Sequence, residues 1–306
     1  MKVSLGPRRV APTRKAGIVT LVAIAASLLS LVVTTPSASA ATSHGCGGGS
    51  FHGTPIPTAA NSPIMKLICA DKTLKAGVAV AFPDLLQNLS TGAYFGPAIT
   101  LANKIASVLH VKLDLVLTNF DVLAPAIEAQ DYELDIAPTF ATPVREQVLS
   151  FVNYDRAGTC YAVLKSDHSI NSLSDLNKPS TRMLVYTGNG NTTGDEAKYP
   201  KATYVTQIEP PGGQLVGMVA IEAHRADVFP IDSGVAIIAV DKYPQFKILP
   251  GGPKYCIAHP DIPYPVGMAF TKGDTKFSAF LTAIVASMKK ALSKEVIKYS
   301  KPQYFS

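Results

Sequence analysis

Two charged side chains, Arg145 and Asp232, have the types and positions that binding of a small zwitterion would need. Arg145 closes the segment that starts at Asp135, and Asp232 ends the apolar run that starts at Ala226. The planar guanidinium of arginine matches a carboxylate through two parallel hydrogen bonds, and an aspartate accepts hydrogen bonds from an ammonium group. A cleft that holds both side chains could therefore bind a free amino acid.

Each of the two residues also has a purely structural interpretation. Arg145 could be an exposed cation at the start of a helix, where an ion pair contributes little to stability. Asp232 together with Ser233 forms a good N-cap for a helix that begins near Val235. The choice between these interpretations depends on the elements that position the two side chains.

Short apolar runs alternate with helical patterns in both halves of the chain. We expect strands at 76–82, 112–117, 134–137, 182–186 and 226–231, and helices at 99–109, 122–129, 213–223, 235–240 and 277–292. This rhythm predicts parallel strands joined by crossover helices, which is an α/β fold. Between the halves, residues 151–165 are β-rich and contain Gly158, a pattern that suits a strand passing between two lobes.

The first 40 residues have the pattern of an export signal. Basic residues between positions 8 and 15 precede the uncharged stretch 16–33, and Ala38-Ser39-Ala40 offers small residues for cleavage. We expect a cleaved signal peptide over 1–40; an uncleaved membrane anchor is the alternative, because the apolar stretch is close to the lower limit for a membrane span. Residues 41–70, rich in Gly, Ser, Thr and Pro up to Pro63, are expected to form a flexible extension.

Removal of the leader changes the charge of the chain. The leader carries five of the 28 Lys and Arg residues and none of the 22 Asp and Glu residues, which leaves a net charge of about +1. A nearly neutral chain lacks the basic surface that nucleic-acid binding requires, so we expect no nucleic acid as a partner.

All four cysteines follow the leader, at Cys46, Cys69, Cys160 and Cys256. An even number of cysteines in an exported chain favours disulfides over a metal site. Four cysteines allow three pairings, and the spacing alone does not choose among them. A zinc site built from Cys46, His44 and His52 is the alternative, but no CxxC spacing supports it, and we expect no metal.

Seven motifs occur in the order that a known family shows. They are Leu74–Val78, Phe120–Ala126, Thr142–Glu146, Phe151–Tyr154, Ser172–Leu176, Ala226–Ser233 and Tyr264–Asp274. With them, the chain from about Leu74 to Phe305 resembles the extracytoplasmic solute-binding proteins of amino-acid ABC transporters. The resemblance implies a type II periplasmic-binding fold, with two α/β lobes, each a mostly parallel sheet flanked by helices, joined by two hinge strands.

The resemblance also implies domain boundaries and a disulfide pairing. The first part of lobe 1 would span 71–157, lobe 2 would span 158–258, and the rest of lobe 1 would span 259–306. Because the two hinge strands would lie side by side, Cys160 and Cys256 would come close together and form one disulfide. Cys46 and Cys69 would form the other.

Roles for individual residues follow from the same resemblance. Arg145 together with Thr142 would bind the α-carboxylate of the ligand, and Asp232 would bind its α-ammonium group. Phe120 would stack on the ligand side chain, and Phe82 would cover it from the other wall. Such a site pairs both charges of an enclosed zwitterion, which otherwise costs several kcal/mol for each ion.

The set of expected ligand-binding residues is completed by three threonines, Thr139, Thr192 and Thr193. Thr192 and Thr193 match a turn in the family whose hydroxyls and helix N-terminal amides meet the carboxylate. Because residues 189–191 look inserted in this turn, Asn189 is an alternative to Thr192. Ala79 stands where receptors for cationic amino acids carry an acid, so we expect a ligand with an uncharged side chain.

The function that the resemblance implies is capture of an amino acid and its delivery to an ABC permease in the membrane, by a monomer without a cofactor. Cys46 lacks the preceding apolar residue of a lipoprotein signal. A diffusible receptor needs an outer membrane to retain it, so we expect the periplasm.

Two alternatives to transport remain open. One is an exported enzyme similar to cyclohexadienyl dehydratase, in which a buried acid such as Glu196 or Glu209 would act in the cleft. The other is a ligand sensor that docks on a membrane kinase. The chain contains no GxSxG, HExxH or P-loop motif, and we expect no catalytic residue and no enzymatic activity.

Overall fold

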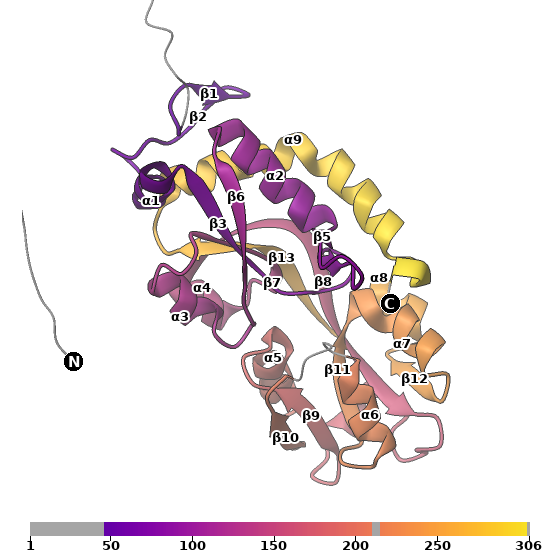
Figure 1. Ribbon diagram of the computed structural model, residues 1–306. Helices are drawn as coiled ribbons and strands as arrows, with labels where there is room; N and C mark the ends of the chain where they lie inside the picture. The colour runs from indigo at the N-terminus through magenta and orange to yellow at the C-terminus, as the bar shows by residue number, and fades with distance from the viewer. Residues whose placement is uncertain (1–45, 210–214, 305–306) are drawn as a thin grey trace, which may run out of the picture. The chain divides into compact units, whose positions relative to one another are not determined.

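The computed structural model describes residues 46–209 and 215–304. Within them the main sheet has nine strands, in the order β10-β9-β11-β8-β13-β7-β3-β6, with β12 paired to β8 (Figure 1). The strands are β3 (Thr73–Val78), β6 (Lys112–Leu117), β7 (Leu134–Phe140), β8 (Leu149–Leu164), β9 (Arg182–Tyr186), β10 (Thr203–Gln207), β11 (Val228–Asp232), β12 (Phe246–Leu249) and β13 (Ile262–Thr271). Short hairpins are formed by β1 (Ser50–Phe51) with β2 (Thr54–Pro55), and by β4 (Leu86–Gln87) with β5 (Tyr94–Phe95).

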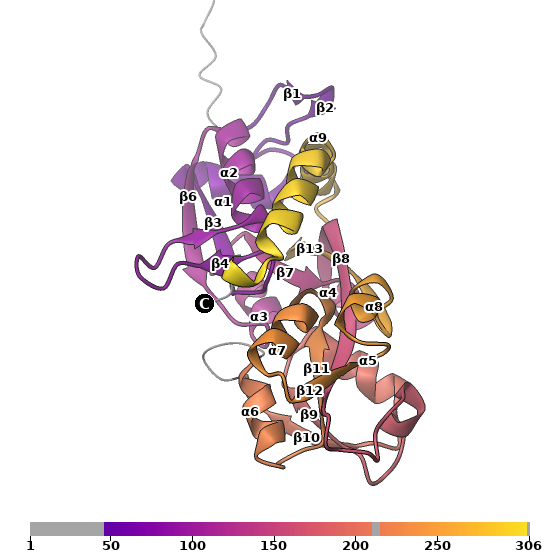
Figure 2. The same ribbon diagram turned by 90° about the vertical axis from the view of Figure 1, so that its right-hand side faces the viewer.

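Helices cover both faces of this sheet. They are α1 (Pro63–Asp71), α2 (Pro97–Leu109), α3 (Leu123–Glu128), α4 (Pro143–Val148), α5 (Gly190–Lys198), α6 (Val216–Glu222), α7 (Ala236–Lys242), α8 (Pro253–Ala258) and α9 (Thr275–Tyr299). Figures 1 and 2 show α2 lying beside α9. Pro97 occupies the first turn of α2, where its missing N–H costs nothing, and the helix ends at His110 in the left-handed conformation.

Two long antiparallel strands, β8 and β13, connect the two lobes. They pair over ten residues of β13, from Ile262 opposite Thr159 to Thr271 opposite Leu149. On one side of them β6, β3 and β7 run parallel, and on the other side β10, β9 and β11 run parallel. The predicted two-lobed α/β fold is thereby confirmed. We propose that the lobes divide at residues 157 and 258, which lie within β8 and at the end of α8.

Side chains that point alternately to the two faces of the sheet explain why helices cover both faces. In β8, Cys160 and Ala162 enter one core, and Tyr161 and Val163 enter the core on the opposite face. The neighbouring strand β9 divides its residues in the same way. Successive side chains of a strand point to opposite faces, so a continuous apolar run requires a helical layer on each side.

The segment before β3 differs from the predicted flexible extension over 41–70. Among its described residues, α1 buries Ile64, Met65 and Ile68 in the core of lobe 1, and Phe51 packs against that core. Ser62 caps α1 by accepting a hydrogen bond from the backbone N–H of Met65. The composition was misleading because a few apolar residues at helical spacing are enough to dock a short segment that is also cross-linked.

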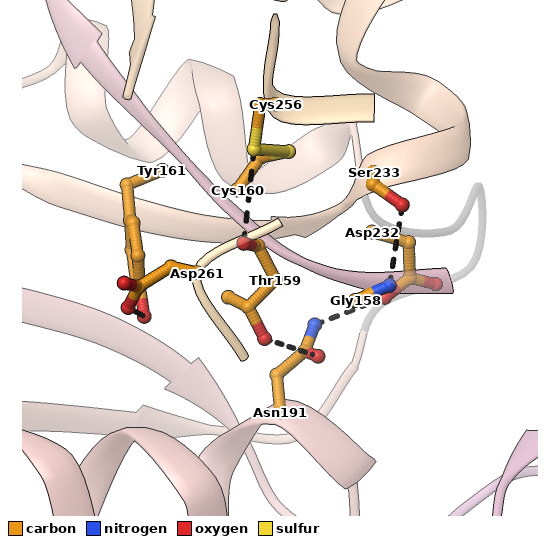
Figure 3. The surroundings of a disulfide bond; sticks show 9 residues. All are labelled: Gly158, Thr159, Cys160, Tyr161, Asn191, Asp232, Ser233, Cys256 and Asp261. Atoms are coloured by element: carbon orange, nitrogen blue, oxygen red, sulfur yellow. Dashed lines mark hydrogen bonds between the residues drawn. A yellow bond between two sulfur atoms is a disulfide. The ribbon is translucent and has the colours of Figure 1, made fainter. Parts of the chain in front are cut away.

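Two disulfides are present, with the pairing that the sequence analysis favours. Cys46 pairs with Cys69 at a Cα–Cα distance of 5.2 Å, and Cys160 pairs with Cys256 at 6.0 Å. The second disulfide joins β8 to α8 (Figure 3). The predicted signal peptide, and His44 of the alternative zinc site, lie outside the described residues. In the part of the chain that the structure describes, no helix is both long enough and apolar enough to span a membrane.

Candidate functional site

Arg145 projects from α4, a short helix that follows the last strand of the parallel set in lobe 1. Thr142 caps this helix, because its hydroxyl accepts a hydrogen bond from the backbone N–H of Arg145 at 3.3 Å. The guanidinium donates from Nη1 to the carbonyl of Phe140 at 3.2 Å and from Nη2 to the carbonyl of Gly188 at 2.7 Å. Gly188 follows β9, so the arginine spans from lobe 1 to lobe 2.

Asp232 lies at the end of β11 in lobe 2. Its Oδ1 accepts a hydrogen bond from Nδ2 of Asn191 at 3.0 Å, and the amide oxygen of Asn191 accepts one from the hydroxyl of Thr159 at 2.9 Å (Figure 3). The backbone N–H of Gly158 donates to the hydroxyl of the neighbouring Ser233. These bonds attach the carboxylate-bearing turn to the hinge strand β8.

Arg145 and Asp232 line the same cavity. Its described walls are Phe120, Pro138, Phe140, Arg145, Asn189, Gly190 and Asp232. A larger cavity of about 130 Å³ adjoins it, and Pro138, Phe140 and Asp232 form walls of both. The two cavities are therefore parts of one cleft, which residues of both lobes line and which the hinge strands close on one side.

The two phenylalanines of the predicted set occupy different parts of this cleft. Phe120 lines the cavity that contains Arg145, whereas Phe82, only 8% exposed, lines the larger cavity. Phe82 also packs with the core of lobe 2, although it follows a strand of lobe 1. Phe120 was expected to stack on the ligand side chain; because it lines the cavity of Arg145, we propose instead that it contacts the main-chain end of the ligand, and that Phe82 contacts the side chain.

Three of the predicted threonines, Thr139, Thr192 and Thr193, line neither of the two cavities. The hydroxyl of Thr139 donates to Asp135 at 2.7 Å, and that of Thr192 donates to the carbonyl of Tyr186 at 2.8 Å. Thr193 is exposed. In their place Asn189 lines the cavity, the residue that the inserted turn had suggested as the alternative to Thr192.

Burial sets the electrostatics around Arg145. Burial raises the pKa of Asp135 to about 7, although hydrogen bonds from Thr139 and from the backbone of Ala137, and the charge of Arg145, oppose the rise. Burial also lowers the pKa of Arg145, and Asp135 and Asp232 oppose this effect. A guanidinium nevertheless stays protonated in a protein, so this cleft holds a partly desolvated cation to which a carboxylate would bind strongly.

Two acids of the cleft escaped the sequence analysis. Asp84 and Asp155 line the larger cavity together with Asp232. The only available signal was that Asp84 follows closely on Phe82, because neither acid belongs to a motif that the sequence analysis used.

Glycines of lobe 2 allow the two lobes to approach each other around the cavities. A Cβ atom on Gly188 would lie 2.3 Å from the Cα of Asp121, and one on Gly190 would lie 3.0 Å from Nη1 of Arg145. A Cβ on Gly234 would lie 2.9 Å from the ring of Pro83. Each of these glycines meets a residue of lobe 1, so side chains at these positions would hold the lobes apart.

Gly188→Ala is expected to weaken ligand binding by about tenfold or more, because a 2.3 Å contact with backbone has no room to relax unless the lobes separate. Gly92→Ala is the matched control, since Gly92 has a similar φ of +72° against +74° but no neighbour within 4 Å. Both variants should lose about 1 kcal/mol of stability from the backbone strain. Titration calorimetry and thermal unfolding separate the two effects; equal affinities in the two variants would contradict the role of Gly188 in lobe contact.

Comparison with known proteins places this geometry in a family. Residues 74–300 match the family model described as bacterial extracellular solute-binding proteins, family 3. Among solved structures, the chain is similar to the ancestral amino acid-binding protein AncCDT-1, a precursor of cyclohexadienyl dehydratase. The identity is 25% over 80% of this chain and 100% of that one, with a TM-score of 0.64.

Two further solved structures show the same fold. Holo ArgBP from T. maritima is 25% identical, over 79% of this chain and 99% of that one, with a TM-score of 0.60. A putative binding component of an ABC transporter from Wolinella succinogenes, complexed with lysine, is 22% identical over 74% and 94% of the respective chains, with a TM-score of 0.62.

Proposed function

We propose that this chain, which belongs to family 3 of the bacterial extracellular solute-binding proteins, captures a free amino acid between its two lobes and delivers it to an ABC permease. The observation that carries this proposal is the position of Arg145 and Asp232. They come from different lobes and line one cavity. The strands β8 and β13 join the lobes beside this cavity and would act as the hinge on which the lobes open and close.

Binding follows from the pairing of charges. The α-carboxylate of the ligand would take the guanidinium fork of Arg145, in place of one or both of its carbonyl partners, and the α-ammonium group would bind Asp232. Only the closed form, in which the lobes lie together, pairs both charges, so the ligand shifts the population toward the closed form. A membrane permease would recognise this closed form.

The cellular setting is part of the same proposal. Family membership supports an extracytoplasmic protein, and we propose that the signal peptide over 1–40 is cleaved on export to the periplasm, where the protein acts as a monomer. A sensor that docks on a membrane kinase would use the same lobes and the same ligand, so it differs from this proposal in the membrane partner alone.

An enzyme related to cyclohexadienyl dehydratase is the second candidate, because the cleft region holds acids with raised pKa values. Burial, followed by the charges of Asp232 and Asp121, raises the pKa of Glu209 to about 7, a value suited to general acid catalysis. Glu196 is exposed and lines neither of the two cavities. AncCDT-1, described as a precursor of that enzyme, is itself an amino acid-binding protein, which favours the receptor.

The test is a thermal-shift screen of the purified protein, after unfolding and refolding to remove carried-over ligand. Each of the amino acids and a set of carboxylates including prephenate would be added at about 100 times the expected dissociation constant, where a ligand stabilises by about 2.7 kcal/mol. We expect a rise of about 5–10 °C with one or a few amino acids. No response to any amino acid would refute the proposal, and turnover of prephenate would establish the enzyme.

The solved structures named above are described as bound to, or as binding proteins for, arginine, lysine or amino acids in general. For this chain an uncharged side chain is expected from the sequence, because Ala79 stands where receptors for cationic amino acids carry an acid. The acids that line the larger cavity help to decide whether the ligand side chain is charged.

A further inference from the structure

Three carboxylates line the larger cavity of the cleft. Asp84 comes from the loop after β3, Asp155 from the hinge strand β8 and Asp232 from the end of β11. Arg156 is the one cation among the described residues that line the cavity, and its side chain is exposed. In the described part of the chain neither Asp84 nor Asp155 forms an ion pair, so the cavity lining holds more acidic groups than basic ones.

Asp84 is the most confined of the three acids. It is 5% exposed, and its Oδ1 has no hydrogen-bond partner among the described residues. The hydroxyl of Tyr154, also buried, lacks a partner there as well. Buried polar atoms in native proteins nearly always have partners, since an unpaired one costs about 1–3 kcal/mol. Asp84 therefore brings an acceptor without a partner to the lining of the cavity, where a polar occupant could supply a donor.

The backbone holds Asp84 in this position. Its N–H donates to the carbonyl of Ala81 at 3.1 Å, and its own carbonyl accepts from the N–H of Ala98 at 3.0 Å. Gly96 packs so closely on that carbonyl that a Cβ would lie 2.6 Å away. These contacts fix the backbone of Asp84 against the start of α2, so the residue keeps its place at the cavity.

The larger cavity adjoins the amino-acid clamp, by which we mean Arg145 and Asp232. The larger cavity shares Asp232, the proposed ammonium partner, with the cavity of Arg145. A ligand held by Arg145 and Asp232 would therefore extend its side chain into the larger cavity. Phe82 and Val266 supply apolar walls beside the acids. Apolar walls fit a methylene stem, and the carboxylates at the end fit a cationic head.

We infer that the ligand is a basic amino acid, whose guanidinium or ammonium head binds Asp84 and Asp155. The inference rests on the proposed function and specifies its ligand class. It replaces the expectation of an uncharged side chain, which rested on the missing acid at Ala79 and on the two phenylalanines expected at the ligand. In this chain one acid, Asp84, lies five residues after Ala79, and the other, Asp155, lies in the hinge strand β8.

Ionisation of Asp84 gives the inference a second readout. Burial, together with the negative charges of Asp155 and Asp232, raises the pKa of Asp84 well above its usual range. Burial likewise raises the pKa values of Asp155 and of Tyr154, the other titratable groups that face it. A cation placed against Asp84 stabilises its charged form, so binding should release a proton at any pH where Asp84 is protonated in the free protein.

The experiment compares basic ligands with uncharged ligands of the same shape. Titration calorimetry would measure arginine against citrulline and lysine against norleucine, in two buffers of different ionisation enthalpy. Wild-type protein should bind one basic amino acid about 30-fold or more tightly than its uncharged counterpart, with release of a proton. Asp84→Asn should lose both the preference and the proton release, but keep its affinity for uncharged ligands.

Two further variants keep the test decisive. Asp114→Asn changes an exposed acid on β6 and should behave as wild type. Asp155→Asn should lower the preference for the basic ligand even if Asp84→Asn does not fold. Binding of uncharged amino acids alone would overturn the inference and leave the proposed function intact, whereas no binding of any amino acid would refute the proposed function itself. Binding of a basic ligand that both variants leave unchanged would overturn the assignment of its head to Asp84 and Asp155.

Discussion

Arg145→Ala is expected to reduce ligand affinity by about 100-fold or more while the protein remains folded. The guanidinium supplies two donors to the α-carboxylate in a partly desolvated cleft, and loss of one partner of a buried charge pair costs about 3–5 kcal/mol. Arg145→Lys should recover little of this, because an ammonium group cannot form the two parallel bonds. Titration calorimetry with the ligand from the screen measures the loss.

Arg182→Ala is the matched control for this prediction. Arg182 is also an arginine with hydrogen-bonded partners, because its guanidinium donates to the carboxylate of Asp227 at 2.6 Å. Unlike Arg145, it lies outside both cavities. Its replacement should leave affinity unchanged. Far-ultraviolet circular dichroism and the melting temperature would show that both variants are folded. Wild-type affinity in Arg145→Ala would refute the assignment of the carboxylate site.

Removal of the disulfide between Cys160 and Cys256 is expected to produce the largest loss of stability. The bond closes a loop with a sequence separation of 96 residues, for which the chain-entropy model gives about 4–5 kcal/mol. Both residues are fully buried, so alanine is the substitution that introduces no unpaired polar group. The double variant Cys160→Ala/Cys256→Ala should melt about 10 °C or more below the wild type.

The other disulfide offers an internal comparison. Cys46 and Cys69 are separated by 23 residues, for which the same model gives about 3 kcal/mol, so Cys46→Ala/Cys69→Ala should have the smaller effect. Thermal and urea unfolding measure both losses. Detection of free thiols in the unreduced wild type, or a larger loss from the shorter loop, would contradict the prediction.

Secondary structure followed from the sequence wherever the apolar pattern was strong. The strands expected at 112–117 and 182–186 are β6 and β9, with the same ends. β9 is an apolar run after Arg182, and β6 begins with alternating polar and apolar residues, so in both cases the local pattern was enough to indicate a strand. The expected helix at 277–292 is present but longer at both ends: it begins two residues earlier, capped by Asp274, and it continues to Tyr299.

Elements without such a pattern were missed. Residues 190–198, GNTTGDEAK, contain two glycines and few apolar side chains, yet they form α5. This helix is anchored by Asp195, which is fully buried and accepts a hydrogen bond from the hydroxyl of Tyr161 at 2.7 Å. A tertiary contact of this kind overrides weak helix propensity and leaves no periodic signal in the sequence.

The order of the motifs and the alternation of apolar runs were enough to predict a two-lobed α/β architecture. Residue types were enough to predict that Arg145 could bind a carboxylate and Asp232 an ammonium group. The folded chain was needed to show which threonines have structural hydrogen bonds, and that Asp84 and Asp155 share a cavity with Asp232. The reason is physical: periodicity reports which face of an element is buried, whereas a cleft is formed where the ends of several strands, distant in sequence, converge at the hinge.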